Sequence, residues 1–134
     1  MNYLAVVAAA IASIVIGSIW YGPLFGKKFQ QAAGMDKWSP EKQAEEKKKM
    51  GKLYAMQIIA SLIMFYILSV FVDNTGDVTV KTSIYTALLA WIGFVVPVQL
   101  GSAIWGGSMT LFYLGAGNML LTLLAAGAIV GFWS

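Results

Sequence analysis

Four long stretches without a charged side chain constrain this chain more than any other feature. They fall at about residues 3–22, 53–72, 82–104 and 109–133. A helix that crosses the hydrocarbon core of a bilayer needs about 20 apolar residues, and each stretch is long enough. None of them has a charged face that would seek water, so packing all four into a soluble bundle would leave nothing to face solvent. The pattern predicts an all-α fold: a four-helix transmembrane bundle that forms a single domain over residues 1–134.

The composition agrees with this interpretation and narrows the chemistry. Only 11% of the residues are charged and 59% are hydrophobic, whereas an ordinary soluble domain has about 25% charged residues. The chain contains no cysteine, histidine or arginine, which argues against disulfides, thiol nucleophiles, Cys/His metal sites and imidazole acid–base chemistry. The segment 73–77 resembles part of a calcium loop but lacks the remaining ligands. We therefore expect no cofactor, no metal and no enzymatic activity.

The charge lies between the apolar stretches and is distributed unequally. Residues 23–52 hold eight of the nine lysines and four of the six acidic residues. Because positively charged loops stay on the cytoplasmic side, this segment is expected inside the cell. Both termini would then lie outside, in a multi-pass protein of the cell (inner) membrane. A cleaved signal peptide carries its positive charge before the apolar run, so we interpret the first stretch as an uncleaved helix.

The basic segment 23–52 has internal patterning that predicts a cytoplasmic helical hairpin between the first and second membrane helices. Residues 24–33 mix apolar side chains with lysine and glutamine before Gly34, as in a short helix on a membrane surface. Ser39 and Pro40 form a typical helix start, and this second helix can run on into the second stretch. The run Lys47, Lys48 and Lys49 is either a topology signal or a contact for anionic lipid head groups. The basic pI of about 9.2 reflects this segment and does not indicate nucleic-acid binding.

A sequence run at the end of the first stretch reads WYGPLFGK. Its marked residues are Trp20, Tyr21, Gly22, Pro23, Gly26 and Lys27. Proline lacks an amide proton and disfavours helix at the preceding residue, so the first helix is expected to end at Gly22 or to kink sharply. The two glycines permit close backbone approach, and the two aromatic side chains are expected to anchor the helix at the membrane interface. The run predicts a rigid turn into the surface helix.

This run, with four further segments, resembles the bacterial membrane family catalogued as DUF1761. The further segments are the opening residues 1–6, the run GFVVPVQL at 93–100, the pair 105–106 and the last stretch around Asn118. The resemblance covers nearly the whole chain, although the connection at 105–108 lacks the charged residues expected from the family. It implies a four-helix integral membrane protein. The family has no established activity, so it assigns no catalytic residue.

Small residues recur at four-residue spacing along the apolar stretches. The expected helix-packing positions are Gly17, Gly93, Pro97, Gly101, Gly127 and Gly131. In lipid, such stripes let helices approach closely, and packing drives their association. A stripe that the internal bundle does not use could serve a homodimer or a membrane-protein partner.

Uncharged polar side chains are the only candidate site chemistry within the apolar stretches. At 1.5 Å per residue, three of them lie roughly 6–8 Å from the expected cytoplasmic edge and three roughly 12–14 Å from it. The shallower three are Ser18, Gln57 and Gln99, and the deeper three are Ser13, Ser61 and Asn118. This polar layer has two interpretations: interhelical hydrogen bonding, or a cavity that opens to the cytoplasm.

Two function classes therefore remain open. The favoured hypothesis is a structural or accessory membrane component without a biochemical activity that the sequence names. The alternative is a small transporter or channel for an uncharged or weakly polar solute, with the polar layer as its cavity. Proton-coupled antiport is disfavoured because the stretches contain no membrane-embedded carboxylate.

Overall fold

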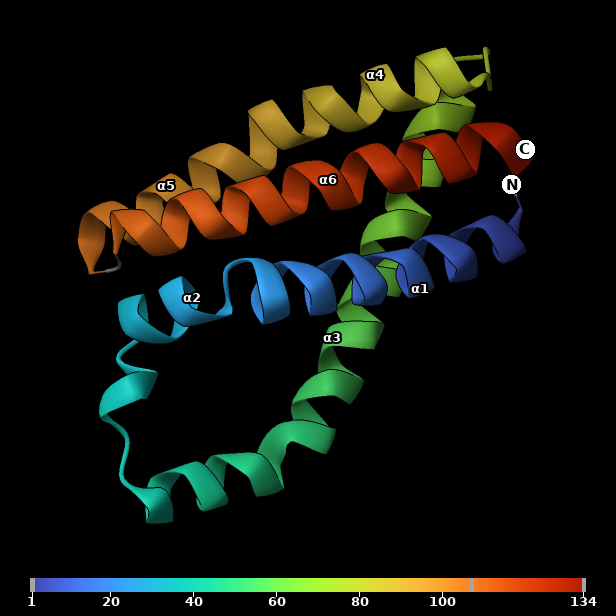
Figure 1. Cartoon of the computed structure of the whole chain (residues 1–134). Helices are drawn as coiled ribbons and strands as arrows, with labels where there is room; N and C mark the ends of the chain where they lie inside the picture. Colours follow the sequence, from blue (N-terminus) through green and yellow to red (C-terminus); the bar gives the residue numbers. More distant parts are fainter. Residues whose placement is uncertain (1, 107, 134) are drawn as a thin grey trace.

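The protein is described by a computed structural model that covers residues 2–106 and 108–133, and all regular structure in these residues is helical (Figure 1). The elements in chain order are α1 (Tyr3–Ile19), η1 (Trp20–Leu24), α2 (Gly26–Ala32), η2 (Met35–Lys37), α3 (Pro40–Asn74), α4 (Val80–Ala90), η3 (Trp91–Val95), α5 (Val96–Trp105) and α6 (Met109–Trp133). Four helical units are long and apolar enough to cross a membrane: Tyr3–Leu24, Pro40–Asn74, Val80–Trp105 and Met109–Trp133. The all-helical prediction is therefore confirmed.

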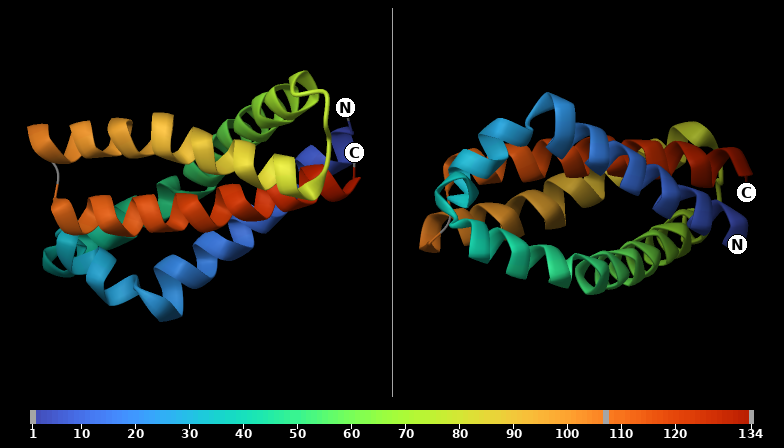
Figure 2. Two further views of the ribbon diagram at one scale, coloured as in Figure 1. Left: turned by 90° about the horizontal axis from the view of Figure 1, so that it is seen from above. Right: turned by 60° about the horizontal axis from the view of Figure 1, so that its bottom comes forward.

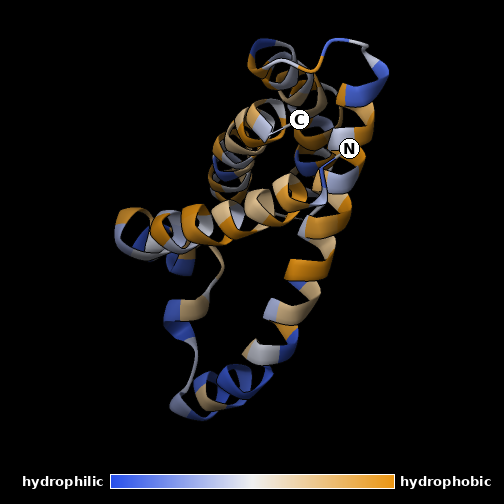
Figure 3. Cartoon of the chain, turned by 90° about the vertical axis from the view of Figure 1, so that its right-hand side faces the viewer, coloured by the Kyte–Doolittle hydropathy of each residue, from blue (hydrophilic) through white to orange (hydrophobic). Residues whose placement is uncertain are grey.

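Helix α3 begins much earlier than the apolar stretch that it contains. The side chain of Ser39 caps its first turn, because Oγ accepts a hydrogen bond from the backbone N–H of Lys42 at 3.2 Å. The helix then continues through Gly51 to Asn74 without a break. One glycine costs a helix only about 1 kcal/mol, which a helix of 35 residues tolerates. The basic segment is thus joined rigidly to the second apolar stretch, and its first turns carry most of the hydrophilic colour in Figure 3.

Helix α6 lies at the centre of the packing. It runs antiparallel to the unit formed by α4, η3 and α5, and it also lies along α1 (Figure 2). Helix α3 meets α1 near the end of the molecule that carries the termini, and the two helices diverge toward the other end (Figures 1 and 2). The buried core follows this geometry and occupies the terminal half. Its members are Val6, Ala9, Ala10, Phe65, Leu68, Val72, Ala87, Leu123, Ala126 and Val130.

The two ends of the described chain lie together. The amide Nδ2 of Asn2 donates a hydrogen bond to the backbone oxygen of Trp133 at 2.7 Å, while Oδ1 of the same side chain caps α1 through the N–H of Leu4 at 3.0 Å. Both termini are therefore at one end of the molecule (Figure 1).

Pro23 and Pro97 each lie within or close to a turn of π-helix. Pro23 lies inside η1, where the N–H of Phe25 donates to the oxygen of Trp20 at 2.9 Å. Pro97 follows η3. The longer i→i+5 bond lets a helix pass a residue that has no amide donor. The sequence predicted that the first helix ends at Gly22 or kinks sharply. The α-helix ends at Ile19, a π-helical turn continues to Leu24, and the chain then bends sharply into α2 (Figure 2).

The two glycines of the run WYGPLFGK, at residues 20–27, have different roles. Gly26 is buried, and a Cβ atom there would lie 2.9 Å from the backbone oxygen of Tyr21, so only glycine permits this close approach. Gly22 has open space within 4 Å of its Cβ position, and the expected close contact is absent there.

The predicted packing stripe is confirmed on α6. A Cβ atom on Gly127 would lie 2.8 Å from the oxygen of Ser83, and one on Gly131 would lie 2.6 Å from the Cα of Val80. These two glycines let α6 touch the backbone of α4.

The small-residue stripe predicted on the third stretch does not contact α6. Gly93 and Pro97 are exposed, and nothing lies within 4 Å of the Cβ positions of Gly93 and Gly101. The residues that face α6 recur at the same four-residue spacing but two positions away: Ser83, Ala87, Trp91, Val95 and Gln99. Two residues correspond to about 200° around a helix, so the predicted stripe points away from α6. Gly17 also has no neighbour within 4 Å of its Cβ position.

Candidate functional site

A cavity of about 630 Å³ lies in the half of the molecule opposite the core. We call it the polar cavity. All six residues of the predicted polar layer line it: Ser13, Ser18, Gln57, Ser61, Gln99 and Asn118. They come from α1, α3, α5 and α6, so the fold brings together side chains that are far apart in the sequence. Its size falls within the range of small-molecule sites, about 300–1,000 Å³.

Residues of four helices form the walls of the polar cavity. Helix α1 lines one side, α3 the opposite side, and α6 with Gln99 of α5 forms the back. Helices α1 and α3 diverge in this half of the molecule (Figure 2). Ile14 of α1 and Ile58 of α3 belong to the lining and are 38% and 39% exposed. We call the part of the lining between these two exposed side chains the side opening.

The polar cavity ends blindly toward the core. Phe65 and Thr122 line its deep end and are buried, and Met119 packs against the core cluster. Tyr21, Gly22 and Tyr54 line the opposite end, which is the end of the basic segment. The cavity therefore reaches only part of the way through the molecule.

The polar groups of the cavity do not bond across it. Ser13 Oγ donates to the oxygen of Ala10 in its own helix at 2.7 Å, and Gln57 Nε2 donates to Ser61 Oγ one turn along α3 at 3.3 Å. Of the five buried side-chain oxygen atoms without a hydrogen-bond partner among the described residues, three belong to the cavity lining: Gln99 Oε1, Asn118 Oδ1 and Thr122 Oγ1. The interhelical hydrogen bonds of the first interpretation are thus missing from the described part of the chain. An unpaired buried polar group costs about 1–3 kcal/mol, so a molecule that supplied donors here would be bound favourably.

The run WYGPLFGK, at residues 20–27, also forms part of this site. The ring of Trp20 lies against α6 so closely that a Cβ atom on Gly117 would be 2.8 Å from it, and the ring packs on Phe25 at a centroid distance of 4.6 Å. Trp20 therefore packs between α1 and α6. Tyr21 lines the cavity and packs edge-on against Phe29. Lys27 is exposed on α2.

The sequence match to known families covers the cavity and all four long helical units. The profile of the family described as "Protein of unknown function (DUF1761)" matches residues 4–131. The chain belongs to the DUF1761 family. No curated protein and no solved structure matches it. The family assignment therefore extends over every residue of the polar cavity but names no activity for it.

Several residues of the DUF1761 site were not singled out from the sequence. Thr122 lies one turn beyond Asn118, and Tyr54 lies one turn before Gln57. Gly115 approaches the amide of Gln99, with a Cβ position 3.4 Å from Nε2. Thr122 and Tyr54 could have been predicted, because each lies four or three residues, about one helical turn, from a predicted polar residue.

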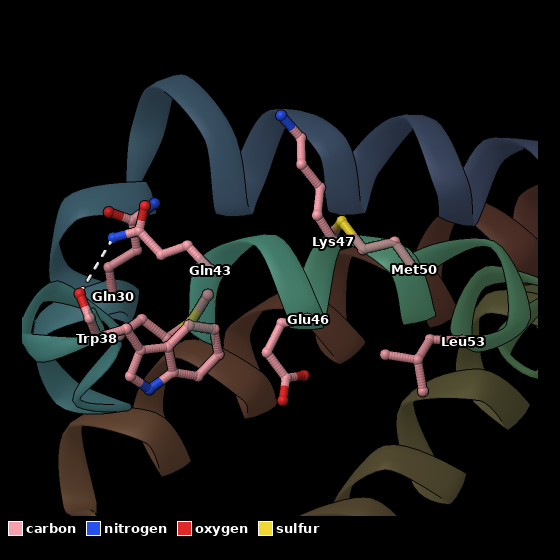
Figure 4. A pocket seen from close by; sticks show the side chains of 8 residues that line it. Gln30, Trp38, Gln43, Glu46, Lys47, Met50 and Leu53 are labelled. Carbon is pink, nitrogen blue, oxygen red and sulfur yellow. Dashed lines mark hydrogen bonds between the residues drawn. The ribbon is translucent and has the colours of Figure 1, made fainter. Parts of the chain in front are cut away.

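A second, smaller cavity of about 390 Å³ lies between α2, η2 and the first turns of α3 (Figure 4). We call it the surface cavity. It is lined by Gln30, Met35, Trp38, Gln43, Glu46, Lys47, Met50 and Leu53. Gln43 Nε2 donates to the backbone oxygen of Trp38 at 3.3 Å, and Lys42 Nζ lies 5.0 Å from the centre of the Trp38 ring. Of the lysine run, Lys47 lines this cavity and Lys49 lies 3.8 Å from a carboxylate oxygen of Glu46.

The chemistry available to the polar cavity is hydrogen bonding without charge. Its lining holds no charged side chain, and the described residues contain no group of three His, Cys, Asp or Glu that could hold a metal ion. Amide, hydroxyl and phenol groups line the cavity together with isoleucine, methionine and phenylalanine side chains. Such a surface suits an uncharged molecule that has both hydrogen-bonding groups and an apolar part.

Proposed function

We propose that this DUF1761 protein is a multi-pass protein of the inner membrane that binds and translocates an uncharged, hydrogen-bonding molecule in its polar cavity. In this proposal the four long helical units form a transmembrane bundle, and residues 23–52 form a cytoplasmic hairpin. The observation that carries the proposal is the set of three buried, unpaired oxygen atoms on Gln99, Asn118 and Thr122 around one cavity. Structural hydrogen bonding alone would give each of these acceptor atoms a donor from the protein.

The blind end of the cavity favours a carrier over a channel. A channel needs a continuous path, whereas the core cluster fills the half of the molecule beyond Phe65. A carrier holds its ligand near the middle of the membrane and exposes it to one side at a time. In this proposal the cavity exchanges its ligand at the end of the basic segment, where Tyr21, Gly22 and Tyr54 line it.

Thermal unfolding of the purified protein in mild detergent tests this function. The chain would be melted with polyols, amides and monosaccharides, and with charged acids and amines of matched size. Saturable stabilisation by a neutral compound is expected, about 2.7 kcal/mol at a hundredfold excess over its Kd. Charged compounds should have no effect, because the cavity offers no counter-charge. Stabilisation by charged compounds would contradict the proposal, and so would the failure of every neutral compound, whether solute or lipid, to bind.

The orientation is tested separately with single cysteines in this cysteine-free chain. Ser39→Cys, at the start of α3, should stay unlabelled by an impermeant maleimide in intact cells and become labelled after lysis. Asn74→Cys, at the other end of the same helix, should be labelled in intact cells. The motive is the lysine asymmetry of the two ends, and the reverse labelling pattern would overturn the orientation.

A structural or accessory role remains the second candidate function, and one observation favours it. In the third span, only 6% of the apolar window is buried within the chain, and Gly93 and Pro97 lie on that exposed surface. Close packing on these small residues would suit a membrane-helix partner or a second copy. We further propose that Lys47, Lys48 and Lys49, which are all exposed, contact anionic lipid head groups.

A further inference from the structure

One face of α3 lines both cavities. Its residues in the surface cavity are Gln43, Glu46, Lys47, Met50 and Leu53, and those in the polar cavity are Tyr54, Gln57, Ile58, Ser61, Met64 and Phe65. Each member lies one or three positions after the previous one, and this spacing keeps them on one face of the helix. Residues 43–65 span about 33 Å of helix. The two cavities are therefore consecutive sections of one groove, which we call the α3 groove.

The two sections of the α3 groove differ in chemistry. The outer section carries Glu46 and Lys47 beside Trp38, side chains that suit the depth of lipid head groups. The inner section is uncharged and contains the unpaired oxygen atoms of Gln99 and Asn118. The chemistry of the groove thus changes from that of a membrane surface to that of a dry, hydrogen-bonding site.

The inner section is accessible from the side. The side opening lies between Ile14 of α1 and Ile58 of α3, two apolar lining residues that are partly exposed. Ile14 lies ten residues before Leu24, the end of its span, which corresponds to about 15 Å of helix. A molecule that enters here comes from the hydrocarbon of the membrane rather than from water.

We propose that the ligand of the polar cavity is a lipid of the cytoplasmic leaflet with an uncharged, hydroxylated head group, of the acylglycerol class. A free hydroxyl of the head group donates a hydrogen bond to Gln99 Oε1 or Asn118 Oδ1, and the acyl chains leave through the side opening into the bilayer. A phosphate head group is excluded from the inner section, because its charge would be desolvated there without a cation. This inference rests on the proposed function, since it names the ligand class of the same cavity.

The first test compares a lipid with its free head group. Radiolabelled dioctanoylglycerol should bind saturably to the full chain in mild detergent. Glycerol, which lacks the buried acyl chains, should bind at least about tenfold more weakly. Dioctanoylphosphatidylglycerol, whose head group is charged, should fail to compete with the neutral lipid.

A matched pair of variants separates binding in the cavity from partition into the micelle. Gly17 lines the cavity, and Gly93 lies on the exposed surface of the third span. Both have open space within 4 Å of the Cβ position. Gly17→Phe places a ring in the inner section and should weaken dioctanoylglycerol binding by about tenfold or more, while Gly93→Phe should bind like the wild type. If Gly17→Phe does not fold, Ser18→Phe, on the same wall, provides the same comparison.

The outcomes separate this inference from the proposed function. Binding of free polyols or sugars without binding of dioctanoylglycerol would overturn the lipid assignment and leave the cavity function standing. Equal binding by Gly17→Phe and Gly93→Phe would place the lipid outside the groove and overturn the inference as well. Failure of every neutral lipid and every neutral solute to bind would remove the proposed function itself.

Discussion

Gly131→Leu is expected to prevent α6 from packing on α4 and to leave little folded protein. A Cβ atom at this position would lie 2.6 Å from the Cα of Val80 and 2.7 Å from the backbone oxygen of Thr79. Backbone atoms cannot rotate away as a side chain can, so the helices must separate. Overpacking costs about 1–3 kcal/mol and occasionally more, and we expect the upper end here because three further leucine carbon atoms follow the Cβ. The free energy of unfolding, measured by circular dichroism in mixed micelles with increasing SDS, provides the test.

The matched control for this change is Gly101→Leu. It adds the same side chain to a span helix, but nothing lies within 4 Å of its Cβ position. Its free energy of unfolding should stay within about 0.5 kcal/mol of the wild type. Gly127→Leu should resemble Gly131→Leu, since its Cβ position lies 2.8 Å from the oxygen of Ser83. Equal stability of Gly131→Leu and Gly101→Leu would rule out the proposed α4–α6 contact.

The spans could be predicted from the sequence because charge is so costly in a membrane interior. Charge-free stretches of about 20 residues leave few alternatives, and the helical units of the structure contain all four. The helix cap at Ser39 could likewise be predicted, because a hydroxyl side chain before proline can accept hydrogen bonds from the first backbone amides of a helix in any context. The grouping of the six polar residues followed from depth alone, since rise per residue fixes height along a span.

Rotation about each helix axis could not be predicted in the same way. On the third stretch, two stripes two residues apart were both plausible contact faces, and small residues favoured the one that proved to be exposed. The fold uses the other, where Trp91 Nε1 donates to the backbone oxygen of Ala116 at 2.8 Å. Tryptophan was assigned to the membrane interface by its average preference, yet Trp20 fills the space opposite Gly117. Which faces meet depends on the shape of the partner helix, and a single stretch of sequence does not contain that information.

Asn118→Leu should weaken ligand binding without loss of stability. The Oδ1 atom of Asn118 is buried, lines the polar cavity and has no partner among the described residues. Leucine of similar size removes an unsatisfied polar group, so the free energy of unfolding should be unchanged or higher by about 1 kcal/mol. Without Asn118 Oδ1, a hydrogen-bond donor of the bound ligand stays unpaired. This costs about 1–3 kcal/mol and weakens binding roughly 5- to 150-fold.

The comparison with Asn74→Leu makes this result specific to the cavity. Asn74 is exposed at the end of α3 and lies outside both cavities, so the same amide-to-leucine change there should leave the Kd of the neutral ligand unaltered. Isothermal titration and SDS unfolding of both variants measure the two quantities independently. A site made for binding loses affinity and keeps stability when its amide is removed, whereas a structural hydrogen bond does the reverse. Destabilisation of Asn118→Leu with an unchanged Kd would therefore assign this side chain to helix association and remove it from the binding site.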